Sequence, residues 1–246
     1  LLACVGAAIG LGNIWKFPYM AGTQGGGAFV LIYLVTIFLI AMPVAAAELI
    51  TGRMARRNAV DSVIYLARDT KSPALFGIAG LIAVLASFML LTFYPVISGW
   101  VMAYLSKSLL GGFSGFDADQ VATEFKDLLA NPAEMIFWQV TFLMLTGLVI
   151  SRDIRSGLEK ANIFLMPVLF LMLVMVVIYG AIEGDIGAAI SFLFTPDFSS
   201  ITPDVILSAV GHGFFSVGVG AAMLITYGSY LDHHVSIGEA AITIGI

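Results

Sequence analysis

The sequence GAAIGLGNIWKFP at residues 6–18 holds three glycines within its first seven residues and ends on a proline. A second glycine-rich stretch, GHGFFSVGVGAAMLITYG, covers residues 211–228. Each glycine inside a helix costs about 1 kcal/mol relative to alanine. Two such stretches, one at the start of each presumed half of the chain, predict two helices that are interrupted midway. For either stretch alone, close packing of neighbouring helices is the alternative explanation.

The rest of the sequence is too apolar for a water-soluble protein. The chain has 246 residues, of which 60% are hydrophobic and 11% are charged, and its net charge is −5. An ordinary soluble domain carries roughly 25% charged residues. The 11 basic and 16 acidic side chains cannot cover a water-exposed surface of this size. This composition excludes a soluble enzyme, a nucleic-acid-binding protein and a disordered chain, and it favours a lipid environment.

Charged residues are missing from five long blocks, at residues 17–47, 72–106, 135–151, 161–182 and 205–231. A helix needs about 20 apolar residues to cross the hydrocarbon layer of a membrane. We therefore expect an all-α integral membrane protein with a single transmembrane domain over residues 1–246. The expected crossings are at about 1–21, 27–52, 75–107, 134–150, 161–181 and 204–231, followed by a partial one at 237–246. Because both ends of the chain lie in apolar runs, we expect a fragment of a longer protein.

The basic residues indicate the orientation in the membrane. Eight of the 11 lie in two connections, the second-to-third and the fourth-to-fifth, namely Arg53, Arg56, Arg57, Arg68, Lys71, Arg152, Arg155 and Lys160. The connections between them are mainly acidic. The positive-inside rule then predicts a multi-pass protein of the plasma or inner membrane with a cytoplasmic N-terminus.

An interrupted helix inside a membrane predicts a binding site. Unpaired backbone groups are tolerated there only where they are buried in protein or line a cavity, since each costs several kcal/mol. Freed carbonyl oxygens, together with the side chains of Asn13 and Ser216, form a shell of hard oxygens that suits a dehydrated sodium ion. The amides at the start of a half-helix suit a carboxylate. A cation site beside an anion site is the physical basis of coupled transport.

Several motifs resemble the neurotransmitter:sodium symporter family, which includes bacterial LeuT-like sodium-dependent amino-acid transporters. The matching residues are Gly10 to Tyr19, Gly25 to Phe29, Pro43, Glu48, Gly52, Arg53, Tyr94, Ser98 to Trp100, Phe214 to Ser216 and Thr226 to Tyr230. The resemblance extends over the whole chain. It implies a LeuT-type bundle that comprises the first five-helix repeat, the sixth helix and the start of the seventh, with helices 1 and 6 broken.

The resemblance also implies a set of site residues. Those that match the two sodium sites are Gly6, Ala8, Ile9, Asn13 and Ser216. Those that match the amino-acid site are Ala8, Leu11, Gly12, Leu90, Tyr94, Phe215, Ser216, Gly218 and Ala221. Lys16 and Phe215 match the outer gate, where the family usually has an arginine at the position of Lys16. Tyr33, His212 and Ser216 match the chloride site of chloride-dependent members, which have a glutamine at the position of His212.

Four of the polar residues in the crossings have alternative interpretations. Tyr94 could be a core or interfacial tyrosine, and Lys16 could extend its amine to the membrane surface. Glu48 is costly inside a membrane unless it is neutral or paired, and the resemblance implies a hydrogen bond to the broken sixth helix. His212 is a packed neutral histidine, a donor to an anion or a proton-coupled group.

The resemblance implies sodium-coupled symport of an amino acid by alternating access, with Na⁺ and in some members Cl⁻ as the coupled ions. The lipid bilayer and the amino acid are the expected partners, and neither an organic cofactor nor enzymatic chemistry is implied. The small residues Gly218 and Ala221 suggest room for a large apolar or aromatic amino acid. A channel or a solute sensor on the same bundle is the alternative. Because the seventh- and eighth-helix ligands of the family are missing, we expect residues 1–246 alone not to transport.

Overall fold

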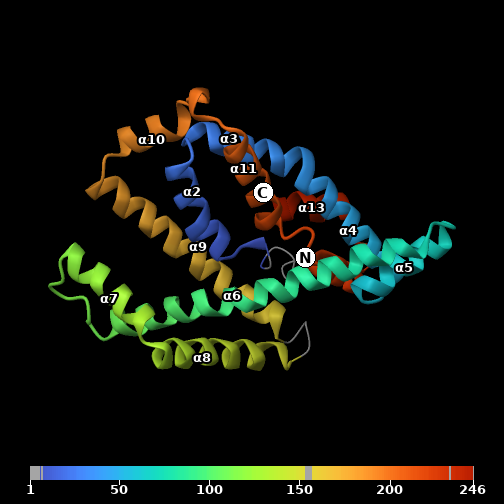
Figure 1. Ribbon diagram of the computed structural model, residues 1–246, viewed down its shortest axis with the longest axis horizontal. Coiled ribbons are helices and arrows are strands. Elements are labelled where there is room, and N and C mark those ends of the chain that lie inside the picture. The colour runs from blue at the N-terminus through green and yellow to red at the C-terminus, as the bar shows by residue number, and fades with distance from the viewer. Residues whose placement is uncertain (1–5, 7, 153–156, 233, 246) are drawn as a thin grey trace. The chain divides into compact units, whose positions relative to one another are not determined.

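A computed structural model of the chain describes residues 6, 8–152, 157–232 and 234–245 (Figure 1). Cys4 in the first expected crossing and Arg155 in a basic connection lie outside these residues. The described residues form helices and connections without a β-strand, which confirms the all-α prediction. The chain divides into two compact units, Leu1–Ala86 with Asn162–Ile246 and Ser87–Ala161.

Four helices among the described residues are long and apolar enough to cross a membrane, by length and composition, at Gly27–Ala55, Gly77–Leu109, Pro132–Ile150 and Lys160–Glu183. The first of these consists of α3 (Gly27–Thr36), a π-helical turn η2 (Ile37–Ala41) and α4 (Met42–Ala55). The other three belong to α6 (Gly77–Leu109), α8 (Pro132–Ile150) and α9 (Leu158–Glu183). In α8 and α9 none of the residues in the apolar window is buried, so their apolar side chains are available to lipid.

Shorter helices begin at side-chain caps that the sequence supplies. Asn58 accepts a hydrogen bond from the Asp61 amide at the start of α5 (Ala59–Asp69), and Asp117 forms a capping box with Gln120 in α7 (Ala118–Ala130). Asp185 caps α10 (Ile186–Phe194), and Thr202 caps α11 (Pro203–Val217). Each cap satisfies an amide that the first turn of a helix leaves without an intrahelical partner.

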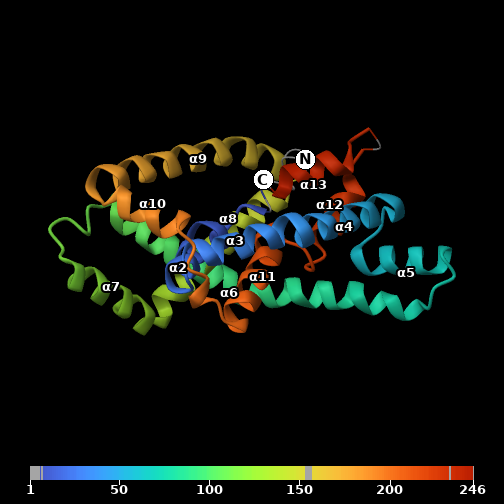
Figure 2. The same ribbon diagram turned by 90° about the horizontal axis from the view of Figure 1, so that it is seen from above.

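The first unit is built around the long crossing at residues 27–55. The α3 half packs against α11, and the α4 half packs against α12 (Met223–Tyr230) and α13 (Ile237–Gly245). Phe29, Leu49 and Leu224 are its largest fully buried apolar residues. Figure 2 shows α12 beside α4. The crossing thus contacts both halves of the second glycine-rich segment.

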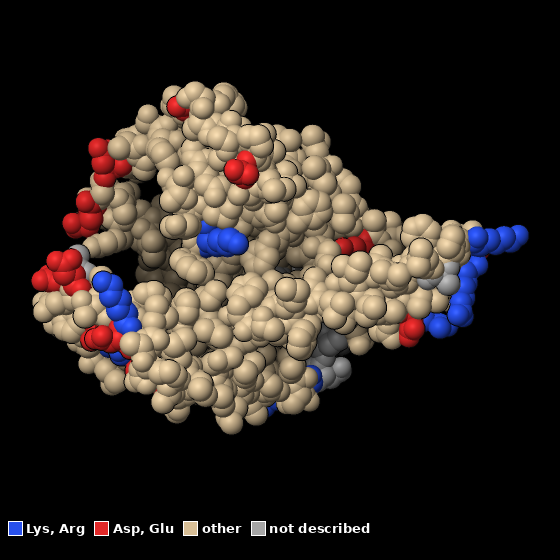
Figure 3. Space-filling model, viewed as in Figure 1, with Lys and Arg blue, Asp and Glu red and all other residues tan. Residues whose placement is uncertain are grey.

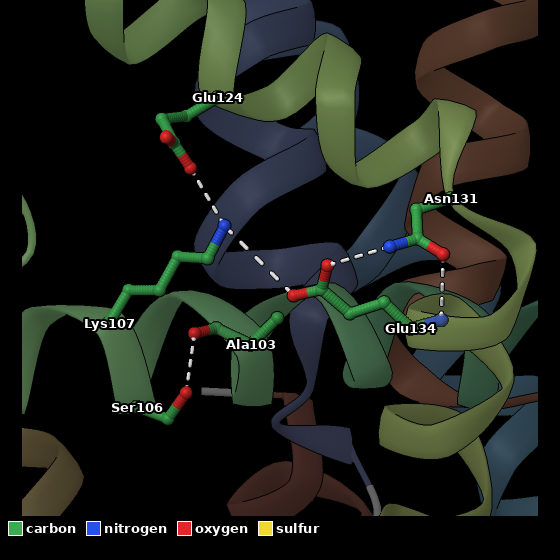
Figure 4. Close-up of polar contacts among 6 residues, drawn as sticks. All are labelled: Ala103, Ser106, Lys107, Glu124, Asn131 and Glu134. Atoms are coloured by element: carbon green, nitrogen blue, oxygen red, sulfur yellow. Dashed lines mark hydrogen bonds and ion pairs between the residues drawn. The ribbon is translucent and has the colours of Figure 1, made fainter.

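In the second unit, a lysine near the end of α6 forms ion pairs with α7 and α8. Lys107 Nζ lies 2.7 Å from Glu124 Oε2 on α7 and 4.0 Å from Glu134 Oε1 on α8 (Figure 4). Glu134 in turn donates its backbone amide to Asn131 Oδ1 at 3.3 Å, which caps α8. The three charged side chains are 31% exposed, so each ion pair stabilises the unit by at most about 1 kcal/mol. Their role is to hold α7 between the ends of two long apolar helices.

Candidate functional site

The first glycine-rich segment is interrupted where the sequence predicts a break. Residues 6 and 8 are helical, residues 9 and 10 form a bend, and a π-helical turn η1 (Gly12–Lys16) leads into α2 (Phe17–Thr23). The amides of Asn13 and Ile14 both donate to Gly10 O, at 3.1 and 3.3 Å. Pro18 sits in the first turn of α2, where a missing amide hydrogen is tolerated.

The second glycine-rich segment is interrupted as well. The helix α11 ends at Val217, and α12 begins at Met223. In between, Gly218, Gly220 and Ala222 have φ angles of 76°, 80° and 59°, in the left-handed region. Glycine adopts this region without steric cost, whereas other residues are strained there. The glycines at positions 218 and 220 therefore explain why the helix stops here, and both predicted breaks are confirmed.

Glu48 satisfies one of the backbone groups that the second break exposes. Its Oε1 atom accepts a hydrogen bond from the Gly220 amide at 2.7 Å. This confirms the hydrogen bond to the broken helix that the sequence implies for Glu48. The other carboxylate oxygen, Oε2, is buried and has no hydrogen-bond partner among the described residues.

The two breaks meet at an aromatic ring. A Cβ atom added to Gly12, just after the first break, would collide with the ring of Phe215, just before the second. Lys16 Nζ lies 5.8 Å from the centroid of the same ring, within the range of a cation–π interaction. Phe215 is thus packed between the backbone of one interrupted helix and the amine of its π-helical turn. The two residues that the sequence assigns to the gate are in contact.

A polar pair and a histidine lie next to this ring. The Tyr33 hydroxyl on α3 donates to Ser216 Oγ on α11 at 2.9 Å in a buried position. The His212 ring is 3% exposed, and its centroid is 5.9 Å from that of Phe17 and 6.2 Å from that of Phe215. Both ring nitrogens lack a hydrogen-bond partner among the described residues. Ring stacking accounts for the position of the His212 side chain.

The chain matches the sequence model of the sodium:neurotransmitter symporter family over residues 1–114 and 118–246. It belongs to this family. The family consists of transporters rather than enzymes, which agrees with the resemblance seen in the sequence.

Individual members of the family extend the comparison. The chain is 38% identical to the sodium-dependent transporter YhdH of Bacillus subtilis, over 99% of this chain and 53% of that protein. It is 28% identical to the human sodium- and chloride-dependent transporter XTRP3, over 100% of this chain and 45% of that protein. The chain therefore spans about half the length of the curated relatives that it matches.

A solved structure confirms the fold. The crystal structure of MhsT in complex with L-phenylalanine matches with a TM-score of 0.92 and 38% identity, over 99% of this chain and 55% of that one. The LeuT-type bundle with broken first and sixth helices is therefore the fold of this family member.

The remaining family positions of the first unit lie along the two breaks. Ala8 is buried, Ile9 lies in the bend, and Gly6 lies against the side chain of Asn162. In the second break, Gly218 and Ala221 are buried.

The first break continues into the π-helical turn; Leu11, which precedes this turn, and Asn13 within it are half-buried. Leu90 and Tyr94 belong to α6 in the second unit, where both are half-buried and Tyr94 O accepts a hydrogen bond from Ser98 at 2.9 Å.

Three features of the site were not predicted from the sequence. The π-helical turn at Gly12–Lys16 has no residue pattern from which it could be predicted. The glycines indicate only that a regular α-helix is unfavourable there. Phe17 contributes a ring 4.6 Å from that of Tyr33, yet in the sequence it is one apolar residue among many. Arg53 and Arg56 bind carbonyl oxygens beyond the second break, at 2.6 and 3.2 Å, whereas their spacing indicates only a basic connection.

Proposed function

We propose that the full-length protein is a sodium-coupled symporter of amino acids that works by alternating access in the cell membrane, with its N-terminus in the cytoplasm. The observation that carries the proposal is the contact between Gly12 and Phe215. Through this contact, the two interrupted helices meet at their interruptions. Backbone groups freed by both breaks therefore face a common region, as a coupled ion and solute site requires.

In this proposal, oxygen atoms of the chain bind both sodium ions, and the carboxylate of the amino acid adds a ligand to the first. The first ion takes the carbonyl of Ala8, the side-chain amide oxygen of Asn13 and the hydroxyl of Ser216, and the second takes carbonyls of Gly6 and Ile9. The Tyr33 hydroxyl supports this arrangement, because its hydrogen bond to Ser216 orients the lone pairs of that oxygen. The names of the sodium-dependent relatives favour the same ion.

The amino acid is held at the first break. The resemblance assigns its carboxylate to the amides of Leu11 and Gly12 and the hydroxyl of Tyr94, and amides at the start of a helical turn attract negative charge. The resemblance also assigns Leu90, Phe215, Gly218 and Ala221 to its side chain, and the small residues at 218 and 221 favour a large apolar or aromatic group. The L-phenylalanine bound to MhsT supports that class of substrate.

The gate and the anion site complete the proposal. Phe215 covers the amino acid, and Lys16 lies over its ring. Tyr33, His212 and Ser216 form a chloride-binding group, in which the unpartnered His212 nitrogens provide the donor that a glutamine provides in chloride-dependent members.

The decisive experiment is sodium-dependent binding to the purified full-length protein, screened over the twenty amino acids. We expect L-phenylalanine, tyrosine or tryptophan to bind in Na⁺ and not in K⁺. The substitution Asn13→Ala weakens binding about tenfold or more, because it removes an oxygen from a desolvated cation. Thr23→Ala on the same segment is the control, since that exposed hydroxyl donates to Tyr19 O within its own helix.

Uptake by liposomes distinguishes a symporter from a channel. Saturable uptake with a fixed ratio of sodium to amino acid supports the proposal, whereas a flux that does not saturate indicates a channel. If aromatic amino acids do not displace a bound small aliphatic amino acid, the proposed substrate class is wrong.

A further inference from the structure

The helices α4 and α12 lie unusually close together and run in the same direction. Glu48 contacts Gly220, which precedes α12, and Arg56 at the end of α4 contacts Leu231 at the end of α12, so the direction of both helices follows from the contacts at their ends. A Cβ atom added to Gly52 would collide with the Ile225 carbonyl, and one added to Gly228 would collide with the carbonyl of Leu49. The two backbones are therefore in direct contact, and both carboxyl ends lie on the same side.

Two arginines at the end of α4 bind the end of α12. Arg56 Nη2 donates to the carbonyl of Leu231, the residue that caps α12, at 3.2 Å. Arg53 Nη1 donates to the carbonyl of Val235 in the connection to α13 at 2.6 Å. Neither arginine forms an ion pair with an acidic side chain in the part of the chain that the structure describes, where ion pairs involve Lys107. Backbone carbonyls are thus the partners of both guanidinium groups.

Electrostatics explains why cations are placed here. The carboxyl end of a helix carries about half a negative charge, and two parallel helices bring two such ends together. A guanidinium group at this point is attracted to both ends and offsets their repulsion. At the opposite end of α12, the carboxylate of Glu48 accepts the Gly220 amide at 2.7 Å. An acid near the amino end and two bases at the carboxyl end therefore attach α12 to α4 with charges that match its dipole.

The basic residues around the α4–α5 connection differ in whether they bind the end of α12. Figure 3 shows Lys and Arg side chains gathered over the region of α5. Arg68, in the last turn of α5, is exposed, and Arg57 lies over the ring of Tyr65, 4.9 Å from its centroid. Among the basic residues that the structure describes here, Arg53 and Arg56 are the ones that donate to described residues of α12 or its connection. They therefore have a specific contact that a general basic surface would not require.

We propose that Arg53 and Arg56 are positioning residues of the transport cycle, which hold α12 docked on α4 and release it when the site opens on that side. This inference rests on the proposed symport function. While both bonds are made, α12 keeps the second break, at Gly218 and Ala221, in the sodium- and substrate-binding geometry. When they break, the far end of α12 swings away from α4, and the Glu48 contact near the break acts as the pivot.

The test measures how often α12 leaves α4. Ile225 is 6% exposed: its carbonyl lies against Gly52 of α4, and its side chain packs with Ala59 of α5 and with Ala222, so a cysteine at this position reacts with a bulky maleimide only when α12 moves away from α4 and α5. The experiment uses the full-length protein in detergent, with Ile225→Cys in a background where Cys4 and any other cysteine are replaced. Without Na⁺, we expect Arg53→Gln with Arg56→Gln to speed labelling about a hundredfold, which is about tenfold for each of the two charged hydrogen bonds that are lost. The control Arg68→Gln removes the same charge nearby and leaves the rate unchanged.

Two further measurements separate positioning from simple loss of stability. Saturating Na⁺ with L-phenylalanine should slow labelling of the double variant to the rate of its parent, and the number of binding sites should stay the same while Kd rises. Arg56→Lys, which keeps the charge, should give an intermediate labelling rate. The proposal is overturned if the double variant labels at the parental rate, or if labelling is fast regardless of Na⁺ and the binding sites are lost.

The two proposals can fail separately. If the parent protein binds no amino acid in Na⁺, the proposed function is wrong. The labelling rates measured without ligand still report on the attachment of α12 in that case, because they require no substrate.

Discussion

At the scale of single residues, the site depends on positions where a side chain is absent. Gly12 allows the ring of Phe215 to rest on the first interrupted helix, and any larger residue would displace it. At the polar positions, by contrast, a specific side chain is required. The Tyr33 hydroxyl donates a hydrogen bond to Ser216 Oγ at 2.9 Å. At the gate, the Phe215 ring therefore occupies the space that a Cβ atom at position 12 would need.

Gly12→Ala should weaken sodium-dependent amino-acid binding about tenfold, because forcing a methyl group into a packed contact costs about 1 to 3 kcal/mol. Equilibrium binding to the full-length protein measures the effect. Gly22→Ala is the matched control, since a Cβ atom at this α2 position meets nothing within 4 Å and alanine favours a helix. Equal affinities for the two variants would show that the Phe215 ring does not need its present position.

At the scale of secondary-structure elements, the interruption between α11 and α12 is built into the backbone. Gly218 and Gly220 hold left-handed conformations, and Glu48 takes up an amide that the break exposes. The short helix α12 is then too small to be stable alone, because isolated helices under about 12 residues are marginal. Packing against α4 therefore provides the stability that so short a helix lacks on its own.

Gly220→Ala should lower the free energy of unfolding of the full-length protein in detergent by about 1 to 2 kcal/mol. A thermal melt measures this loss, and sodium-dependent binding should weaken as well. A Cβ atom at position 220 meets nothing within 4 Å, so the cost is backbone strain at φ 80° rather than a collision. Gly211→Ala in α11, which also has open space around its Cβ position, should leave stability unchanged or raise it. A neutral Gly220→Ala variant would mean that the break does not depend on the left-handed conformation.

At the scale of the whole molecule, the chain presents apolar surface that it does not cover itself. In the windows of α8 and α9, no residue is buried within this chain. Lipid accounts for such surface on an integral membrane protein. The relatives that share the family are about twice as long, since the chain covers 53% of YhdH and 45% of human XTRP3.

We expect liposomes that contain only residues 1–246 not to accumulate amino acid against a gradient in Na⁺, whereas liposomes with the full-length protein do. The physical reason is that the resemblance assigns further sodium ligands to the seventh and eighth helices of the family, and a partly coordinated dehydrated cation is not stable in a membrane. Uptake of radiolabelled L-phenylalanine with an imposed sodium gradient is the measurement. Accumulation by the short chain would contradict the expectation.

The sequence by itself determined the membrane environment, the all-α class and the two breaks of this protein. These are local properties, since missing charge over about 20 residues and glycines clustered within one helix act on the segment that contains them. Family motifs such as Gly10 to Pro18 also indicated the contact of Glu48 with the sixth helix, which the structure confirms.

Only the tertiary structure decided what the two arginines at the end of α4 bind. The Arg53 contact with Val235 joins positions 182 residues apart, and the Arg56 contact with Leu231 joins positions 175 residues apart. Local pattern carries no information about such pairs, because they depend on how α4 packs against α12. In any membrane protein, a basic residue near the end of a crossing indicates which side of the membrane that end faces. It became a helix attachment here because the parallel packing of α4 and α12 brings two carboxyl ends together beside it.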